Sequence, residues 1–295
     1  MKTKILISLI LLLAVSSAVY AQEQQEAEIT KLSKTLTLRV FADYKLMIFQ
    51  QNAEPSYFTA NKPLDLGIGI GIFGFIIKFS MSIPVRYQET ETKKGLALDI
   101  KIDRFGTGSY NYAYLQYNTD FWHVDRGPGE TATLNLLNIG LTHEIIFNKN
   151  HSLSSVYVLD KKQSMSNGSL LLGGGVFFSS MKSGGYTAQN AYKDQYYLHF
   201  GPNIGYSYTW IFNKSLFLNM LLVGGTDLMI SLADKKLDLH LGLQALPKFS
   251  FGYHGDKISW NVYLTGSYLF AYPGKDRQLN LFTGNIGATF IWRIK

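Results

Sequence analysis

Residues 64–72 read Leu-Asp-Leu-Gly-Ile-Gly-Ile-Gly-Ile, and this stretch decides the fold. Large apolar side chains alternate strictly with aspartate or glycine. Because successive side chains of a β-strand point to opposite faces, the segment has one face of large apolar side chains and one face of glycine and aspartate. A strand of this kind suits lipid on one side and a hydrated interior on the other. The pattern therefore predicts the wall of a barrel that crosses a membrane.

The same two-residue period recurs along the chain. It gives thirteen candidate strands, at 35–50, 64–73, 75–84, 95–104, 108–119, 133–147, 152–160, 168–181, 195–212, 216–230, 236–251, 257–272 and 279–294. A single-chain barrel with both ends on one side of the membrane needs an even number. One assignment is therefore wrong, and irregular spacing places the error within 152–194. The sequence predicts an all-β fold: a transmembrane antiparallel β-barrel of about 12 strands over residues 35–295, with 14 as the alternative.

The start of the chain resembles an export signal. Lys2 and Lys4 precede the apolar run Ile5–Val15, and small residues lead to Ala21. This plan predicts a cleavable signal peptide over 1–21, followed by a short periplasmic segment over 22–34. We expect a location in the outer membrane of a Gram-negative bacterium, with outer-membrane lipid, lipopolysaccharide and the barrel-assembly machinery as partners. The formal net charge is +7 without a clustered basic helix, so no nucleic-acid partner is expected.

Three tryptophans predict the orientation of the barrel. Trp210 precedes a tight turn, Trp260 follows another, and Trp292 lies near the C-terminus. Each shares its parity with apolar side chains. If the short turns and the C-terminus lie on the periplasmic side, all three belong to one interfacial aromatic girdle.

Charged residues of the opposite parity are expected to face the lumen. Their mixed signs predict either internal salt bridges that fill a narrow barrel or a hydrated, weakly selective pore, because an isolated charge inside a membrane is costly. The lumen-facing candidates are Arg39, Asp43, Lys45, Lys78, Asp99, Lys101, Asp103, Glu144, Asp238 and His240.

No catalytic or metal-binding pattern stands out. Ser166-Asn167-Gly168 is similar to the serine motif of outer-membrane phospholipase A, but position 164 is Ser where that motif has its histidine base. Ser166 is therefore a weak catalytic candidate, with His143, His199 and His240 as distant bases, and a turn role is preferred. The six histidines are scattered and cysteine is absent, which predicts neither a metal site nor a cofactor.

Four stretches together resemble a known family. They are Ser56–Pro63, Asn138–Lys149, Gln163–Gly173 and Gly201–Trp210. In their order along the chain and in their residues they resemble Bacteroidota outer-membrane barrels of the domain of unknown function 4421 (DUF4421) family. The resemblance extends from about Leu36 to Lys295. The resemblance implies a barrel and its location, and no activity, since none is assigned to the family.

The sequence favours a non-enzymatic barrel that forms a pore or binds a small solute or lipid. Two alternatives remain open. One is a lipid-modifying enzyme based on Ser166. The other is an adhesin or assembly partner that acts through loops near Gln51–Lys62, Phe121–Thr131 and Met181–Asp194. The sequence decides neither the ligand nor whether the lumen is open or plugged.

Overall fold

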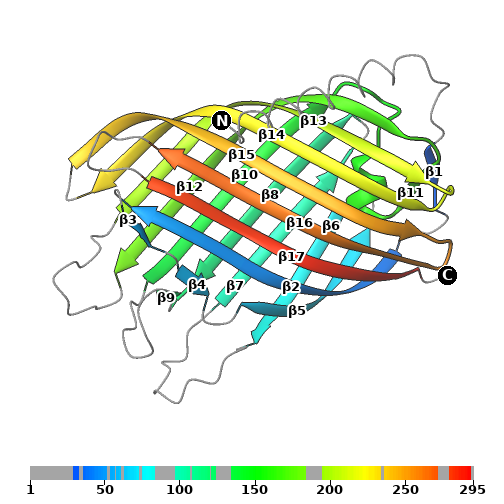
Figure 1. Ribbon diagram of the computed structural model, residues 1–295, viewed down its shortest axis with the longest axis horizontal. Coiled ribbons are helices and arrows are strands. Elements are labelled where there is room, and N and C mark those ends of the chain that lie inside the picture. The colour runs from blue at the N-terminus through cyan, green and yellow to red at the C-terminus, as the bar shows by residue number, and fades with distance from the viewer. Residues whose placement is uncertain are drawn as a thin grey trace.

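The structure is a computed structural model, and it describes residues 29–32, 36–51, 54–56, 58–60, 63–72, 75–83, 97–106, 108–119, 121–123, 134–183, 195–233, 236–271 and 279–293. Within these residues, twelve antiparallel strands pair in chain order, and the last pairs with the first (Figure 1). The sheet is therefore closed. The predicted all-β barrel of about 12 strands is confirmed, and the alternative of 14 is wrong.

The strands of the barrel are β2 (Leu36–Gln51), β5 (Leu64–Ile72), β6 (Phe75–Ile83), β7 (Ala97–Phe105), β8 (Ser109–Asn118), β10 (Leu134–Ile146), β12 (Asn167–Ser183), β13 (Gln195–Phe212), β14 (Leu216–Ala233), β15 (Lys236–His254), β16 (Ile258–Ala271) and β17 (Leu279–Arg293).

The two ends of the barrel differ. Short connections join β7 to β8, β13 to β14 and β15 to β16 at the end where β2 begins and β17 ends. We call this the turn end, which lies at the right in Figure 1, and we call the opposite end the loop end. Full closure pairs the first and last strands, so neither leaves a free edge to lipid.

Side chains alternate across the wall. The outer surface is apolar, with Val40, Ile68 and Leu241 exposed by 61%, 67% and 76%. The inner surface is largely polar, and Arg39 and Asp65 on neighbouring strands are buried. This alternation is the pattern of a barrel that faces lipid outside and a polar lumen inside. In the described part of the chain, no helix is long and apolar enough to cross a membrane.

The glycines of β5 make room inside the barrel. A Cβ atom at Gly67 would overlap the ring of Phe41, and one at Gly71 would overlap the Thr37 hydroxyl and lie 3.2 Å from the Arg39 guanidinium. Two large inward side chains of β2 therefore depend on the absence of side chains on the neighbouring strand. The glycine pattern positions Arg39 at the turn end of the lumen.

The predicted strand at 152–160 is wrong. β10 and β12 pair directly, from Ile146↔Leu171 to Leu134↔Ser183, so the residues between them have no place in the sheet. They form instead a single π-helical turn, η2 (Ser154–Val158), and a short strand, β11 (Lys161–Gln163), inside the turn end. This removes the excess thirteenth strand.

Short strands lie outside the barrel sheet. β1 (Ile29–Lys31), from the predicted periplasmic segment, pairs with β11 at the turn end. At the loop end, β3 (Glu54–Ser56) pairs with β2, and β4 (Phe58–Ala60) pairs with β9 (Phe121–His123). Two of the predicted loops thus pair with each other. Residues 1–21, predicted as a signal peptide, lie outside the described residues.

Candidate functional site: a plugged polar lumen

Residues 148–166 fold back into the turn end of the barrel, and we call them the plug segment. Its entry and exit are joined by Asn148, whose side-chain amide donates to the Asn167 side-chain oxygen at 2.8 Å and to the Gly168 carbonyl at 2.9 Å. The Asn148 side-chain oxygen also accepts from the backbone N–H of Asn150 at 3.0 Å. Such a local side-chain hydrogen bond initiates a turn and directs the chain away from the β10 ladder.

The middle of the plug segment is the π-helical turn. At its start, the hydroxyl of Ser152 accepts a hydrogen bond from the backbone N–H of Ser155 at 3.2 Å. At the other end Leu159 is left-handed, with φ of 57°, and its N–H donates to the Ser154 carbonyl at 2.8 Å. A left-handed leucine is unfavourable by itself. It is held because its side chain is fully buried against Phe217 and Ile291.

Two arginines of the barrel wall hold the plug segment through its backbone. Arg39 on β2 donates to the carbonyls of Tyr157, at 3.3 Å, and of Val158. Arg293 on β17 donates to the carbonyl of Leu159 and, at 2.6 Å, to that of Gly255. Both side chains are almost fully buried. Three consecutive carbonyls that the π-helical turn leaves free are thereby satisfied by cations at the negative end of its dipole.

Side-chain packing completes the closure. Tyr157 stacks on Phe105 with ring centroids 5.9 Å apart, and its hydroxyl donates to the Asn219 side-chain oxygen at 2.8 Å. Leu153 and Val158 pack into an apolar cluster with wall residues such as Leu221, and all three are at most 1% exposed. The plug segment is therefore part of the core of this protein, and it closes the lumen at the turn end.

The plug segment also buries a histidine. His151 is 4% exposed, and burial lowers its pKa from 6.5 to about 4. Charging this imidazole inside the barrel would require desolvating a cation. His151 is therefore neutral in the closed barrel at neutral pH.

Above the plug segment, side chains cross the lumen. The Lys248 ammonium on β15 bonds to the Tyr110 hydroxyl of β8, on the opposite wall, and lies 3.9 Å from an Asp103 oxygen. It also lies 4.3 Å from the ring centroid of Tyr112. A cavity of about 40 Å³, which is room for a few water molecules, remains at this level. These side chains therefore narrow the lumen here to a small polar cavity.

The structure places the lumen-facing candidates on the inner wall, in small clusters. Lys101 pairs with Asp99 at 2.9 Å, Asp43 accepts from the Tyr263 hydroxyl, and Lys78 donates to that hydroxyl at 3.2 Å. Four other candidates also have contacts. Arg39 donates to the plug segment, and Lys45 forms an ion pair with Asp65 at 2.9 Å. Asp103 accepts from the Tyr110 hydroxyl at 3.0 Å, and Glu144 accepts from the Asn203 side-chain amide at 3.3 Å. Asp238 and His240 lie on β15 toward the loop end, apart from these clusters.

Sequence reasoning missed several inner-wall residues. Asp65, Lys248 and Arg293 were not among the candidates, although strand parity could have found them: Arg293 alternates with outward Trp292. The other missed feature is a buried pair, His199 Nδ1 and Asp227 Oδ2 at 2.7 Å, on β13 and β14. The two positions are 28 residues apart, and only the β13–β14 register brings them together.

Ser166 lies at the exit of the plug segment, and its hydroxyl accepts a hydrogen bond from the backbone N–H of Ile211 at 2.9 Å. His199 is twelve residues before Ile211 on the same strand, which is about 40 Å at roughly 3.3 Å per residue. His240 lies in the same register row as His199, with Met229 of β14 between them, and is therefore equally far from Ser166. His143 points outward, where it bonds to Asn111. The structure does not bring these bases to Ser166.

The three tryptophans all lie near the turn end. Trp210 is two residues from the end of β13, Trp260 is two residues after the start of β16, and Trp292 precedes the last residue of β17. Trp292 is 62% exposed on the outer wall.

A closed sheet that is apolar outside, polar inside and filled at one end by its own chain defines the class: a plugged β-barrel with the fold of outer-membrane proteins. The chain belongs to the domain of unknown function family DUF4421, whose model matches residues 27–293. The predicted family membership is therefore confirmed.

Solved structures similar to this chain are outer-membrane proteins. The outer membrane protease OmpT of Escherichia coli is 8% identical, with 92% of this chain and 99% of that chain covered and a TM-score of 0.41. In-vitro folded OmpT of Vibrio cholerae is 9% identical, with 88% and 98% covered and a TM-score of 0.32. No curated protein matches the sequence.

Proposed function

We propose that this protein is a non-enzymatic outer-membrane barrel that binds a small solute or lipid and is closed toward the periplasm by its plug segment. The observation that carries the proposal is the anchoring of that segment: two buried arginines on three consecutive carbonyls, over an apolar cluster. A constitutively open pore would need that space for solute. Polar side chains along the inner wall supply hydrogen-bond donors and acceptors for a bound molecule.

The proposal includes a route and a location. The chain is exported through a cleaved signal peptide over residues 1–21 and is inserted by the barrel-assembly machinery. It resides among outer-membrane lipid and lipopolysaccharide of a Gram-negative bacterium, in the Bacteroidota as the family resemblance implies. The apolar outer surface and the three tryptophans near one end support the membrane setting. The adhesin alternative rests on the loops alone.

Conductance of the refolded barrel in a planar bilayer tests the proposal. Wild-type protein should remain closed almost all of the time. Arg39→Gln removes two hydrogen bonds to the plug segment, and a bond to a charged group is typically worth about 1.5 to 3 kcal/mol, so open events should become at least about tenfold more frequent. Arg104→Gln changes an arginine on the outer side of β7 and should leave the closed state intact.

A wild-type barrel that conducts continuously, at the level of Arg39→Gln, would contradict the plugged state. Equal, rare opening in all three proteins would show that Arg39 does not hold the plug segment.

A further inference from the structure

One seam of the barrel is paired over only part of its length. β6 pairs with β5 along all nine of its residues, and β7 pairs with β8 along all nine. Between β6 and β7, however, the ladder has four pairs, from Phe75↔Arg104 to Lys78↔Lys101. Beyond it, residues 79–83 and 97–100, all within the described part of the chain, do not pair with each other. We call this place the β6–β7 gap.

The sequence explains why the ladder stops there. Lys78 and Lys101 are directly opposite in the register and both side chains point into the lumen. Like charges in directly opposed positions destabilise strand pairing. Each lysine is held from its own side. Lys101 pairs with Asp99 at 2.9 Å, and Lys78 lies over the Tyr263 ring, 4.8 Å from its centroid.

An unpaired ladder within a membrane wall has a physical consequence. Backbone N–H and C=O groups without partners cost several kcal/mol each in hydrocarbon and are tolerated only where water reaches them. The facing edges of β6 and β7 must therefore be hydrated from the lumen. A seam without ladder hydrogen bonds can part at little cost, and parting would connect the polar interior with the lipid side of the wall toward the loop end.

The lining of the gap is amphipathic. On the inner side, Ser82 donates to Asp65 at 2.5 Å, and Asp65 pairs with Lys45. On the outer side, Phe79 and Met81 of β6 are 60% and 75% exposed, and Leu98 of β7 is 44% exposed. A molecule lying across the gap would meet charged and hydroxyl groups at one end and apolar side chains at the other.

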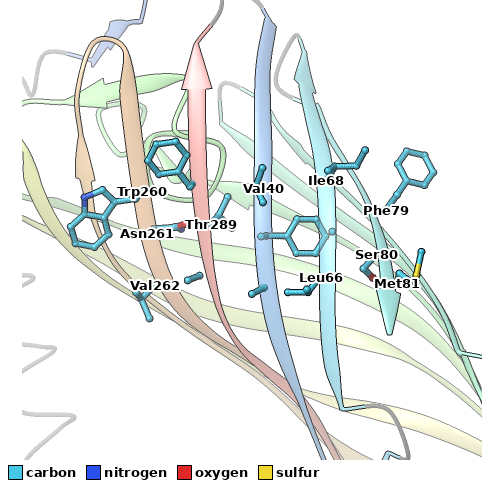
Figure 2. A pocket seen from close by; sticks show the side chains of 15 residues that line it. Val40, Leu66, Ile68, Phe79, Ser80, Met81, Trp260, Asn261, Val262 and Thr289 are labelled. Carbon is cyan, nitrogen blue, oxygen red and sulfur yellow. The ribbon is translucent and has the colours of Figure 1, made fainter. Parts of the chain in front are cut away.

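An apolar groove on the outer wall leads to the same edge. Figure 2 shows it running across the strands from Trp260 and Val262, past Val40, to Phe79 and Met81 on β6. Its volume is about 790 Å³. The groove thus ends where the β6–β7 gap begins, and its lining matches a hydrocarbon chain.

We propose that the β6–β7 gap is a lateral binding site for a single-chain anionic amphiphile of the fatty-acid class. The chain lies in the outer groove, and the carboxylate reaches between the ammonium groups of Lys78 and Lys101, where an anion relieves their mutual repulsion. The inference rests on the proposed function, a binding barrel closed at the turn end, and names the class of its ligand and the path by which it enters.

The absence of cysteine allows single-cysteine reporters. Ser80→Cys places a fluorophore on the inner edge of the gap. Ser231→Cys, its matched control, places one on the inner face of β14, where both neighbouring ladders continue. Refolded barrels in phospholipid vesicles are titrated with a mid-chain dibrominated fatty acid, whose bromines quench nearby fluorophores. We expect saturable quenching at Ser80→Cys and none at Ser231→Cys over the same range.

The head group is tested in two independent ways. A dibrominated alcohol of the same chain length should bind at least about tenfold more weakly, because one bond between charged groups is typically worth that much. Lys78→Gln in the Ser80→Cys background should weaken fatty-acid binding similarly, with heat-modifiable migration in electrophoresis confirming that it folds. The alcohol comparison needs no lysine variant and stands if Lys78→Gln does not fold.

Lack of quenching at Ser80→Cys, while a label at Met81→Cys is quenched by brominated lipid, would overturn the lateral site. Equal binding of acid and alcohol would overturn the role of the lysines. These failures differ from failure of the proposed function, which is a wild-type barrel that conducts continuously whatever the quenching shows.

Discussion

Acidification should release the plug segment, and His151 gives the reason. Its pKa is about 4 in the closed barrel because the imidazole is buried, whereas an exposed histidine titrates near 6.5. Above pH 6.5 the side chain is neutral in both the seated and the released state, so it contributes no pH dependence. Between pH 6.5 and 4 the released state binds a proton that the seated state does not. Seating is therefore fully stable above pH 6.5 and weakens as the pH falls toward 4.

The size of the effect follows from the shift in pKa. Each pH unit below 6.5 favours the released state by about 1.4 kcal/mol until the seated state also protonates. At pH 5 this amounts to about 2 kcal/mol, or about a 30-fold increase in the population with the plug segment released.

The increase can be measured with a single cysteine at Val156, which is 0% exposed in the closed barrel. The rate of its reaction with dithiodipyridine, normalised to the urea-unfolded protein at each pH, reports release of the plug segment. The control is His151→Phe, which keeps a buried planar ring but cannot titrate. A flat pH profile in the wild-type background, or an equal rise in His151→Phe, would refute the reasoning.

Three further predictions concern the wall and the exit of the plug segment. Ile70→Arg should destabilise the membrane-inserted barrel by about 2 to 4 kcal/mol, the cost of arginine on a lipid face, and should therefore impair assembly. Gly69→Ser should keep nearly normal heat-modifiable migration, and equal tolerance of both changes would argue against a lipid-facing position for Ile70. Gly67→Ala should lower the free energy of unfolding in urea by about 1 to 3 kcal/mol, because its Cβ atom would overlap the Phe41 ring and the Phe79 carbonyl. Gly69→Ala should have little effect, because the nearest atom to its Cβ would be the Ile77 carbonyl oxygen at 3.2 Å. Coincident urea midpoints of the two variants would contradict this prediction. Ser166→Ala should cost about 1 kcal/mol of stability by removing the acceptor of the Ile211 N–H, without changing phospholipid hydrolysis; an activity lost in this variant would restore the enzyme alternative.

Most of the barrel was predictable because the signal is local. Strict alternation around Ile68 and Ile70 fixes which side chains face lipid, and the parity requirement identifies one strand too many. The error at 152–160 has a definite reason. In that segment Leu153, Val156 and Val158 are all buried inside the lumen. The apolar residues there indicate burial, but they do not indicate that the buried segment is a strand.

The candidate site was only partly predictable. Parity placed Arg39 on the inner face, but its partners are the carbonyls of Tyr157 and Val158, more than a hundred residues away, and a backbone acceptor leaves no mark in the sequence. The truncated ladder between β6 and β7 is likewise a matter of register. It becomes visible only when Lys78 and Lys101 are placed opposite each other.

By itself, the sequence determined the fold class, the family and the polarity of the two faces, because each depends on the order of residues within one strand or on stretches of continuous chain. Only the tertiary structure decided that the lumen is plugged, that Arg39 and Arg293 hold the plug segment, and that one seam is incomplete. These features depend on which strands meet and in what register. Strand neighbours and register are set by closure of the whole barrel, because the inward side chains of all strands must pack together in one enclosed volume.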